Sequence, residues 1–372
     1  MKTYELVVPC HFGLEAVLKR EIYDLGYEIS RVEDGRVSFQ GDAEAVCRAN
    51  IFLRTAERVL IEVGRFRATT FEELFQGIKA LPWEDYIPVN GKFWVKKASS
   101  IKSKLFSPSD IQSIAKKAMV ERMKQHYDVE WFAEDGAPYP VRIFLLKDEV
   151  MVTLDTSGDS LHKRGYRRTS NAAPIKETLA AGIIDLARVR ADSVVCDPMC
   201  GSGTFLIEAA YKALNVAPGL RRSFAAEKWD QIPTELWRFE RAEAMEKLDR
   251  EGTFHAYGSD IDPASVDLSI MNAKKAGVAS KITVKEQDVM KFTPPEGSIT
   301  ICNPPYGERM LEIKQAEELY KRLGERIKPD SSHPAVIISP DEDFEKFFGK
   351  KADKKRKLYN GMIKCNLYMY FK

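Results

Sequence analysis

The chain has 372 residues, 44% of them hydrophobic and 30% charged, with a formal net charge of +2 at pH 7. This length exceeds one usual hydrophobic core, so we expect two or three domains. The sequence has no apolar run of about 18 residues and no signal-peptide core, which argues against a membrane protein. Its six cysteines are scattered without a CxxC pair, so we expect no disulfide framework, no metal site and a reduced, cytoplasmic protein.

The first 65 residues alternate between strand and helix patterns. Apolar periodicity and turn signals predict, in chain order, a strand at 4–8, a helix at 14–25, strands at 27–32 and 36–39, a helix at 42–50 and a strand at 58–63. Asp42 is the expected N-cap of the second helix. This order of elements is that of a split βαβ, or ferredoxin-like, module.

Residues 66–156 predict a second α+β module. The pattern gives helices near 71–78 and 110–123, and strands near 93–98, 141–146 and 150–154. Ser107 and Pro108 suit the start of the longer helix. Four lysines lie just before that start: Lys96, Lys97, Lys102 and Lys104. A helix N-terminus flanked by lysines can hold a phosphate, although ordinary capping with solvated lysines remains the alternative.

From residue 157 onward the pattern becomes that of a parallel α/β domain. A linker at 157–160 and a basic stretch at 163–168 come first. Strands separated by helices are then predicted at 193–196, 254–259, 282–285, 298–302 and 335–339. Asn360-Gly361, between two further strand-like runs, predicts a type I′ hairpin. We therefore expect a Rossmann-like sheet that ends in an antiparallel hairpin, whereas nucleotide-oxidoreductase sheets more often stay parallel.

The loop after the first of these strands has the chemistry of a nucleotide site. It runs from Asp197 to Thr204, and Gly201 and Gly203 let the backbone approach a ligand at the start of the next helix. Leu206 stands where a dinucleotide fingerprint needs its third glycine, and no GKS or GKT sequence forms a P-loop. An acid ahead of the glycines suits S-adenosylmethionine, which has an amino-acid tail and no pyrophosphate.

Three further polar residues are predicted to follow successive strands. Asp260 can accept hydrogen bonds from both ribose hydroxyls, although a polar insertion at 215–252 places it much further from the glycine loop than the usual distance of about 20 residues. Asp288 follows the third strand and Asn303 the fourth. The carboxyl ends of parallel strands meet at one edge, where α/β proteins bind ligands. Any one acid could be a turn or cap residue, but the ordered set indicates a cofactor site.

The segment Asn303-Pro304-Pro305-Tyr306 suits the methylation of a flat exocyclic amine. The Asn303 side-chain oxygen and the Pro304 carbonyl can each accept an N–H bond, which localises the nitrogen lone pair. The prolines restrict the backbone that carries both acceptors. Tyr306 offers a face on which a base can stack. A proline-stiffened turn without chemistry is the alternative.

These segments together resemble a known family. Asp197 to Thr204, Asp260, Asp288 and residues 303–309 are similar to the ordered motifs of Rossmann-like, S-adenosylmethionine-dependent amino-methyltransferases. Residues 161–167 and 173–180 narrow the resemblance to bacterial large-subunit rRNA guanine-N2 methyltransferases with an N-terminal THUMP RNA-binding domain. The resemblance covers nearly the whole chain. It implies a ferredoxin-like module at 1–65, a THUMP domain at 66–156 and a methyltransferase domain at 157–372.

The resemblance also implies roles for particular residues. The catalytic set is Asn303, Pro304, Pro305 and Tyr306. The set that binds S-adenosylmethionine is Asp197, Gly201, Gly203, Thr204, Asp260, Ile261, Asp288 and Val289. The RNA-binding set is Lys96, Lys97, Lys102, Lys104, Arg164, Arg167, Arg168, Lys354, Lys355 and Arg356. For His162 we expect a structural or RNA-contacting role, because no partner for a general base is visible near it.

The implied activity is formation of N2-methylguanosine in large-subunit rRNA, or in a ribosome assembly intermediate, by direct methyl transfer to an extruded or single-stranded base. An adenine-N6 methyltransferase acting on DNA or RNA stays open, because the Asn-Pro-Pro-Tyr motif does not distinguish the two amines. A non-catalytic RNA-binding assembly factor is a third class. Some relatives carry a second methyltransferase domain, which this chain is expected to lack.

Overall fold

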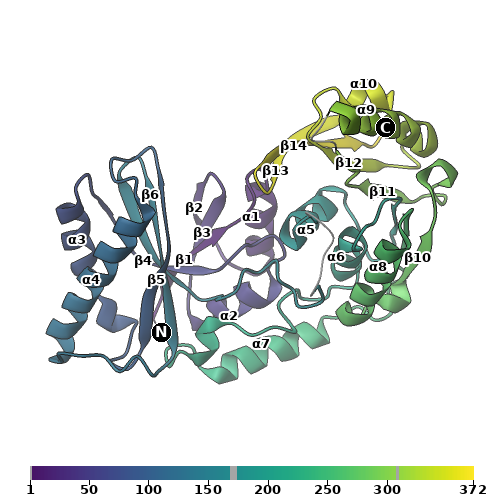
Figure 1. The fold of residues 1–372 in the computed structure, drawn as a ribbon. Coiled ribbons are helices and arrows are strands. Elements are labelled where there is room, and N and C mark those ends of the chain that lie inside the picture. Colours follow the sequence, from purple (N-terminus) through teal and green to yellow (C-terminus); the bar gives the residue numbers. More distant parts are fainter. Residues whose placement is uncertain (1, 168–173, 307–309) are drawn as a thin grey trace.

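The computed structural model describes residues 2–167, 174–306 and 310–372. The chain forms two seven-stranded sheets, one from each half of the sequence, and these lie side by side (Figure 1). No helix in the described part of the chain is long and apolar enough to cross a membrane.

The N-terminal half begins with the predicted ferredoxin-like order of elements. Its strands and helices are β1 (Tyr4–Pro9), α1 (Glu15–Asp24), β2 (Ile29–Glu33), β3 (Arg36–Gly41), α2 (Ala43–Phe52) and β4 (Leu60–Arg67). The strand order is β2-β3-β1-β4, with antiparallel pairing. The Asp42 side chain accepts a hydrogen bond from the Ala45 N–H, so it caps α2 as predicted.

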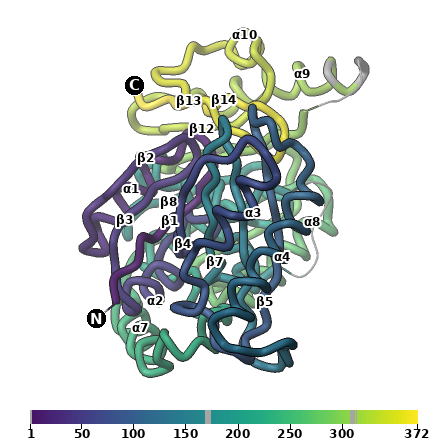
Figure 2. The backbone as a smooth tube through the Cα atoms, turned by 90° about the vertical axis from the view of Figure 1, so that its left-hand side faces the viewer, coloured from purple at the N-terminus to yellow at the C-terminus, as the bar shows by residue number. Residues whose placement is uncertain are grey.

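The second module continues the same sheet and does not form a separate one. Its elements are α3 (Phe71–Lys79), β5 (Lys92–Ile101), α4 (Pro108–Tyr127), β6 (Pro138–Leu146) and β7 (Glu149–Asp155). β7 pairs antiparallel with β4 along most of its length, and β6 and β5 follow it outward. An unpaired β4 edge would expose its backbone hydrogen-bonding groups, and the pairing with β7 removes that edge. The helices α3 and α4 pack against each other beside these strands (Figure 2).

The strands of the C-terminal sheet all run in one direction except the last strand along the chain. Its strands are β8 (Val194–Asp197), β9 (His255–Asp260), β10 (Ile282–Glu286), β11 (Ile299–Cys302), β12 (Ala335–Ser339), β13 (Lys354–Asn360) and β14 (Ile363–Tyr370). The order is β10-β9-β8-β11-β12-β14-β13, and β14 runs antiparallel to both of its neighbours. The predicted fold class, a Rossmann-like methyltransferase sheet that ends in an antiparallel hairpin, is confirmed.

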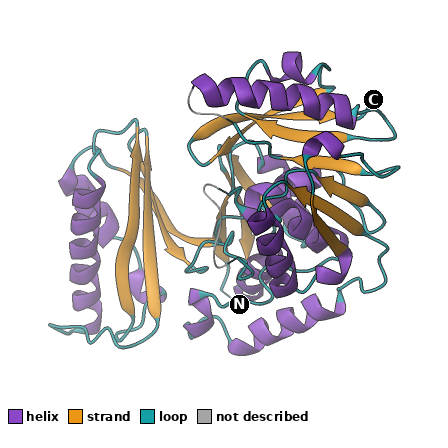
Figure 3. Ribbon diagram, turned by 45° about the vertical axis from the view of Figure 1, so that its right-hand side comes forward, coloured by secondary structure: helices purple, strands orange, loops and turns teal. Residues whose placement is uncertain are grey.

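Helices cover both faces of this sheet (Figure 3). They are α5 (Glu177–Leu186), α6 (Thr204–Ala213), α8 (Pro263–Ala276), α9 (Met310–Ile327) and α10 (Phe344–Phe348). Successive residues of a strand point to opposite faces. Val336 and Ile338 accordingly pack with α5, α6 and α8, whereas Ala335 and Ile337 pack with α9 and α10. The continuous apolar runs of these strands follow from burial on both faces.

The hairpin turn differs from the predicted one. Asn360 pairs with Ile363, so the two-residue loop is Gly361-Met362 and not Asn360-Gly361. Gly361 has φ +64°, and Met362 is not among the described residues with positive φ. A type I′ turn needs positive φ at both central positions, whereas type II′ needs it only at the first. The turn therefore has the pattern of type II′.

The polar insertion of the C-terminal half packs against the N-terminal half. Its helix α7 (Thr234–Glu246) lies beside α2 (Figure 2). Trp237 is 1% exposed and belongs to the core of the N-terminal sheet. Arg48 of α2 donates two hydrogen bonds, of 2.7 and 3.1 Å, to the buried Glu240 carboxylate of α7. In the opposite direction, Leu14 packs into the core of the C-terminal sheet. The two halves therefore share their cores.

Replacing Trp237 with alanine should destabilise the protein. The change empties a fully buried site between α7 and the N-terminal sheet, and such truncations cost about 3–5 kcal/mol. Chemical denaturation, followed by far-UV circular dichroism, measures the loss. Trp131→Ala is the matched control, because Trp131 is 77% exposed and its truncation should change stability by no more than about 0.5 kcal/mol. Equal effects of the two variants would contradict the packing described for α7.

Candidate active site

A cavity of about 670 Å³ lies at the carboxyl ends of the parallel strands. Loops that follow β8, β9, β10 and β11 form its walls, together with α9 and the start of β14. Its lining residues are Pro198, Met199, Gly201, Asp260, Ile261, Ser265, Gln287, Asp288, Val289, Asn303, Pro304, Pro305, Tyr306, Glu312, Leu319 and Ile363. The structure therefore brings all four predicted catalytic residues together with five of the eight predicted cofactor residues.

The glycine loop holds its two glycines for different reasons. Gly201 has φ +51°, and the space where a Cβ would stand is open, so the loop presents bare backbone to the cavity. Gly203 has φ +78°, and a Cβ there would lie 2.2 Å from the Ser269 Oγ atom of α8. Gly203 does not line the cavity. It lets the loop pass close to α8 before α6 begins at Thr204.

Asp260 connects two of the loops. Its Oδ2 atom accepts a 2.9 Å hydrogen bond from the Gly201 N–H, and its Oδ1 atom accepts one of 3.0 Å from the Asp262 N–H. Asp262 in turn caps α8 through bonds from the Ala264 and Ser265 N–H groups. The Asp260 carboxylate is therefore fixed in place at the cavity wall, where its remaining acceptor positions can take ligand hydroxyls.

Asp197 is buried at the end of β8. It accepts a 3.2 Å hydrogen bond from the Met199 N–H. Burial raises the pKa of Asp197 to about 7, and the nearby charge of Asp260 acts in the same direction. Asp197 and Thr204 line a smaller cavity of about 150 Å³, and Asn303 lines both cavities. These two predicted cofactor residues thus lie behind the main cavity.

Asp288 and its neighbours form the far wall. The Asp288 side chain accepts a 2.9 Å bond from the Met290 N–H and so begins a short 3₁₀ turn at Val289–Lys291. Both Asp288 and Val289 line the cavity. The Gln287 N–H donates to the Asp260 carbonyl, which ties this wall to the end of β9. Ile261, 68% exposed, forms part of the rim.

The Asn-Pro-Pro-Tyr segment directly follows β11 and lines the cavity. The Asn303 Oδ1 atom is buried and has no hydrogen-bond partner among the described residues. A buried acceptor without a partner costs about 1–3 kcal/mol, so a ligand donor at this position would bind favourably. The Pro305 carbonyl accepts a 3.5 Å hydrogen bond from the Tyr320 hydroxyl of α9. The Tyr306 hydroxyl accepts a 3.0 Å bond from the Asn360 side chain, which ties the segment to the terminal hairpin.

The predicted RNA-binding lysines lie on two separate surfaces. Lys96 and Lys97 are exposed on β5, and Lys102 and Lys104 are exposed on the loop between β5 and α4. Lys354 and Lys355 are exposed on β13, where Lys355 pairs with Glu345 at 2.7 Å. Neither group lines the cavity. Figure 1 shows β5 and β13 on different parts of the molecule.

Two arginines of the basic stretch at 163–168, Arg164 and Arg167, are mostly buried, contrary to the expected RNA contact. Arg164 is 4% exposed, donates to the Leu161 and Arg54 carbonyls and forms an ion pair with Glu208. Arg167 pairs with Glu177 at 2.7 Å, and both side chains are mostly buried. We therefore exclude Arg164 from the RNA-contacting set. Arg168 lies outside the described residues.

Arg356 also has a structural contact, because it donates a 2.8 Å hydrogen bond to the Gly13 carbonyl of the N-terminal half. His162 lies 3.7 Å from the Glu57 carboxylate, a neighbour that the sequence did not predict, and its structural or RNA-contacting role stays a prediction.

Several lining residues were not predicted from the sequence. They are Pro198, Met199, Ser265, Gln287, Glu312, Leu319 and Ile363. Glu312 and Leu319 are seven positions apart on α9, so their helical spacing could have placed them on one face. Ile363 reaches the cavity only because the hairpin folds back beside β12, and no local signal encodes that placement.

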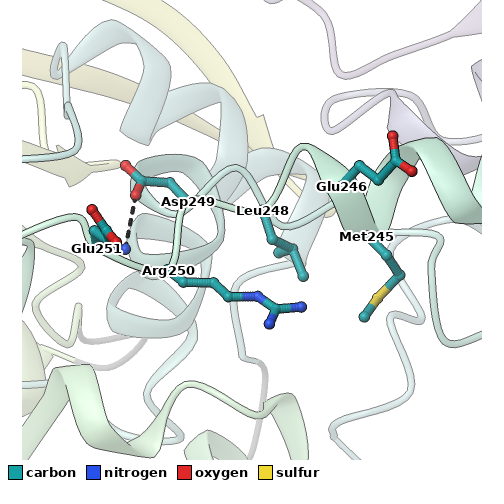
Figure 4. Close-up of a pocket in the computed structure, with 6 residues that line it drawn as sticks. All are labelled: Met245, Glu246, Leu248, Asp249, Arg250 and Glu251. Carbon is teal, nitrogen blue, oxygen red and sulfur yellow. Dashed lines mark hydrogen bonds between the residues drawn. The ribbon is translucent and has the colours of Figure 1, made fainter.

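A second hollow, at the end of α7, is unrelated to this site (Figure 4). All of its lining residues come from the single stretch Met245 to Glu251. The Asp249 side chain there accepts the Glu251 N–H and so closes a turn within that stretch. Within the described part of the chain, no residue of another element lines this hollow, and none of its lining residues lines the cavity beside Asn303.

The fold and the cavity together define a methyltransferase. The model of the RMKL-like methyltransferase domain family (UPF0020) matches residues 164–369, the RlmL ferredoxin-like domain matches 5–60 and the THUMP domain matches 68–155. The chain belongs to the RMKL-like methyltransferase family.

Two relatives and one solved structure illustrate the similarity. The chain is 45% identical to the "Putative RNA methyltransferase YpsC" of Bacillus subtilis (strain 168), across 100% of this chain and 97% of that one. It is 33% identical to the "Ribosomal RNA large subunit methyltransferase K/L" of Psychromonas ingrahamii, across 98% of this chain but 49% of that one. The solved structure is "SMU.472, a putative methyltransferase complexed with SAH", with TM-score 0.94 and 43% identity, covering 100% of this chain and 98% of that one.

Asp197→Asn should change how stability depends on pH. The pKa of Asp197, about 7, lies above the usual unfolded value of about 3.9, so between those values the native state binds more protons than the unfolded chain. The contribution of Asp197 to stability therefore falls as pH rises through this window. The urea midpoint of the variant should fall less from pH 5 to pH 7.5 than that of the wild type. Asp192→Asn, at an exposed position before β8, is the control. Parallel pH curves for Asp197→Asn and wild type would show that Asp197 is not perturbed.

Proposed function

We propose that this protein transfers a methyl group from S-adenosylmethionine to the exocyclic N2 amine of a guanine in large-subunit rRNA. The K/L relatives carry large-subunit ribosomal RNA in their names, and the chain spans about half of their length. The solved relative that binds SAH matches this chain over its whole length, which supports the choice of cofactor. The THUMP match at residues 68–155 supports an RNA substrate.

The observation that carries the proposal is the buried Asn303 Oδ1 atom without a partner in the described residues. It lines the same cavity as Asp260 and Asp288. An aromatic amine donates two N–H bonds and has a poorly nucleophilic, delocalised lone pair. An acceptor that is buried, fixed by Pro304 and left without a partner by the described residues provides the interaction such an amine needs.

The cavity residues fit the proposed cofactor. When bound, S-adenosylmethionine supplies an electrophilic methyl group on a sulfonium. Asp260 would accept hydrogen bonds from the ribose hydroxyls, Asp288 would accept one from the adenine amine, and the bare backbone at Gly201 would permit close approach. The carboxylates of Asp260 and Asp288 also place negative charge around the cationic cofactor.

The residues at the end of β11 orient the nucleophile. Asn303 Oδ1 and the Pro304 carbonyl accept the amine N–H groups and direct its lone pair toward the methyl carbon. Methyl transfer would form the nitrogen–carbon bond and break the sulfur–carbon bond, and the methylated amine would release one proton to solvent. Tyr306 provides a stacking face, and its bond from Asn360 fixes the ring against the hairpin.

Nucleoside mass spectrometry of rRNA from a strain that lacks the gene tests the proposal directly. Loss of one N2-methylguanosine, restored by the wild-type gene, is the expected result. Loss of N6-methyladenosine instead would identify adenine, and not guanine, as the target base. The roles proposed for the other residues of the site would stay the same. An unaltered set of modified nucleosides would contradict the proposed activity.

Asn303→Ala should lower turnover far more than it lowers RNA affinity. The hydrogen bond from the amine strengthens as positive charge develops on the nitrogen, so its loss should reduce kcat by about 10²–10³. Tyr306→Ala should weaken base capture by about 1–3 kcal/mol, whereas Tyr306→Phe keeps the stacking face and should be mild. Single-turnover kinetics on the target RNA measures the first effect, and competition binding measures the second.

Cofactor affinity, measured by calorimetry, should be nearly unchanged in these variants. Asn366→Ala is the matched control. Asn366 lies on β14, on the face of the sheet opposite to that of the cavity-lining Ile363. Near-normal turnover in Asn303→Ala would mean that the motif is only a stiff turn.

Neutralising Lys102 and Lys104 together should weaken RNA binding. Both side chains are exposed beside the N-terminus of α4, where they can contact phosphates. Lys102→Gln/Lys104→Gln should raise the RNA Kd and reduce the slope of log Kd against log salt concentration by about 1 for each phosphate that a lysine no longer neutralises. Lys274→Gln/Lys275→Gln makes the same charge change at the end of α8 and serves as the control. Identical salt slopes in both variants would remove this loop from the RNA-binding surface.

A further inference from the structure

Met362 is an apolar side chain presented entirely to solvent. Its exposed fraction is 97%, higher than that of any other large hydrophobic residue in the described ranges. It occupies the second position of the Gly361-Met362 turn, at the tip of the terminal hairpin. Single exposed apolar residues are common on proteins, so exposure alone indicates nothing. The position of this one is informative.

The hairpin tip forms part of the rim of the cavity. Asn360, just before the turn, donates its side-chain N–H to the Tyr306 hydroxyl at 3.0 Å. Ile363, just after the turn, lines the cavity. These two residues continue the hairpin face that buries Leu358 and Cys365. The turn between them therefore carries Met362 beyond the rim, next to the site proposed for the target base.

The hairpin is also rigid enough to hold a side chain against RNA. Its strands pair continuously from Lys354↔Met369 to Asn360↔Ile363. Phe12 of the N-terminal half packs on the Tyr359 ring, with centroids 5.9 Å apart, and so supports the hairpin from the other half of the molecule. Lys357 lies over the same ring at 5.4 Å and provides positive charge for the RNA backbone.

A base within a helical stack cannot present its exocyclic amine to a buried acceptor, so it must be extruded first. Extrusion leaves a gap in the stack, and nucleic-acid-binding proteins offset the lost stacking by inserting apolar side chains such as Met. We propose that Met362 is such a wedge: it inserts into the RNA stack in the space that the target base leaves on entering the cavity. This inference rests on the proposed function.

The test compares one RNA in two forms. A synthetic hairpin RNA carries the nucleotide identified by mass spectrometry in a base-paired stem, and a second RNA carries the same nucleotide in an unpaired bulge. Met362→Ser should lower kcat/KM on the stem by about tenfold and change it little on the bulge, where the base is already unstacked. Met362→Leu should restore activity on the stem, because it keeps an apolar side chain of similar size.

Two controls separate the wedge from other effects. Met245→Ser changes another exposed methionine, at the end of α7, and should leave kcat/KM unchanged on both RNAs. Met362→Ser should keep the wild-type Tm, because a 97% exposed side chain contributes little to folding. A 2-aminopurine beside the target nucleotide should brighten on binding of the wild type and Met362→Leu, and brighten less with Met362→Ser, without any need for turnover.

Each other outcome argues against the wedge. Equal losses on stem and bulge would assign Met362 to base binding or catalysis, and no loss on either would show that the tip does not act on the RNA. A failure of the proposed function gives a different result, because the wild type would then methylate neither RNA. That result would also contradict the role proposed for Met362.

Discussion

The hydrogen bond from the Gly201 N–H to the Asp260 carboxylate organises the site. It joins the loops that follow β8 and β9, two adjacent strands, and it places a fixed carboxylate beside bare backbone. Gly203 permits this approach, because any Cβ there would collide with α8. The arrangement of Asp197 and Asp260 also disfavours the charged form of Asp197. Burial and the nearby Asp260 raise the pKa of Asp197 to about 7. A buried acid with a perturbed pKa beside a cavity is typical of a functional site.

The second constraint is the joining of the two halves. Glu57 lies at their junction, where its carboxylate accepts a hydrogen bond from Thr178 and lies 3.3 Å from the Lys176 ammonium of the C-terminal half. Burial alone would raise the pKa of Glu57, but the neighbouring His11 and His162 side chains and the hydrogen bond from Thr178 hold it below its usual range. With the packing of α7 on α2, this junction fixes the exposed lysines of the N-terminal half at a set position relative to the cavity.

Local patterns in the sequence predicted most elements and the polar residues at the strand ends. Ala335–Ser339 forms a strand with the predicted bounds, and Asp197, Asp260, Asp288 and Asn303 all follow or end strands as expected. These features depend on periodicity and on the geometry of parallel sheets, both of which are local. The pairing of β4 with β7 joins residues more than 80 positions apart along the chain. The burial of Arg164 depends on Glu208, about 40 positions away. Periodicity within a segment encodes neither contact. The turn at Gly361-Met362 is shifted by one residue because the register follows from pairing along the whole hairpin.

That one-residue shift matters for the site. In the predicted Asn360-Gly361 turn, Asn360 would lie in the loop, and its side chain would not lie on the same face of the hairpin as Leu358. Because Asn360 instead ends β13, opposite Ile363, its amide reaches the Tyr306 hydroxyl and Ile363 reaches the cavity. The antiparallel end of the sheet, which distinguishes this fold from a parallel nucleotide-binding sheet, therefore supplies a wall of the cavity and a support for its aromatic residue. The cofactor residues come from the parallel strands, and the features that suit a base come from the last parallel strand and the hairpin beside it.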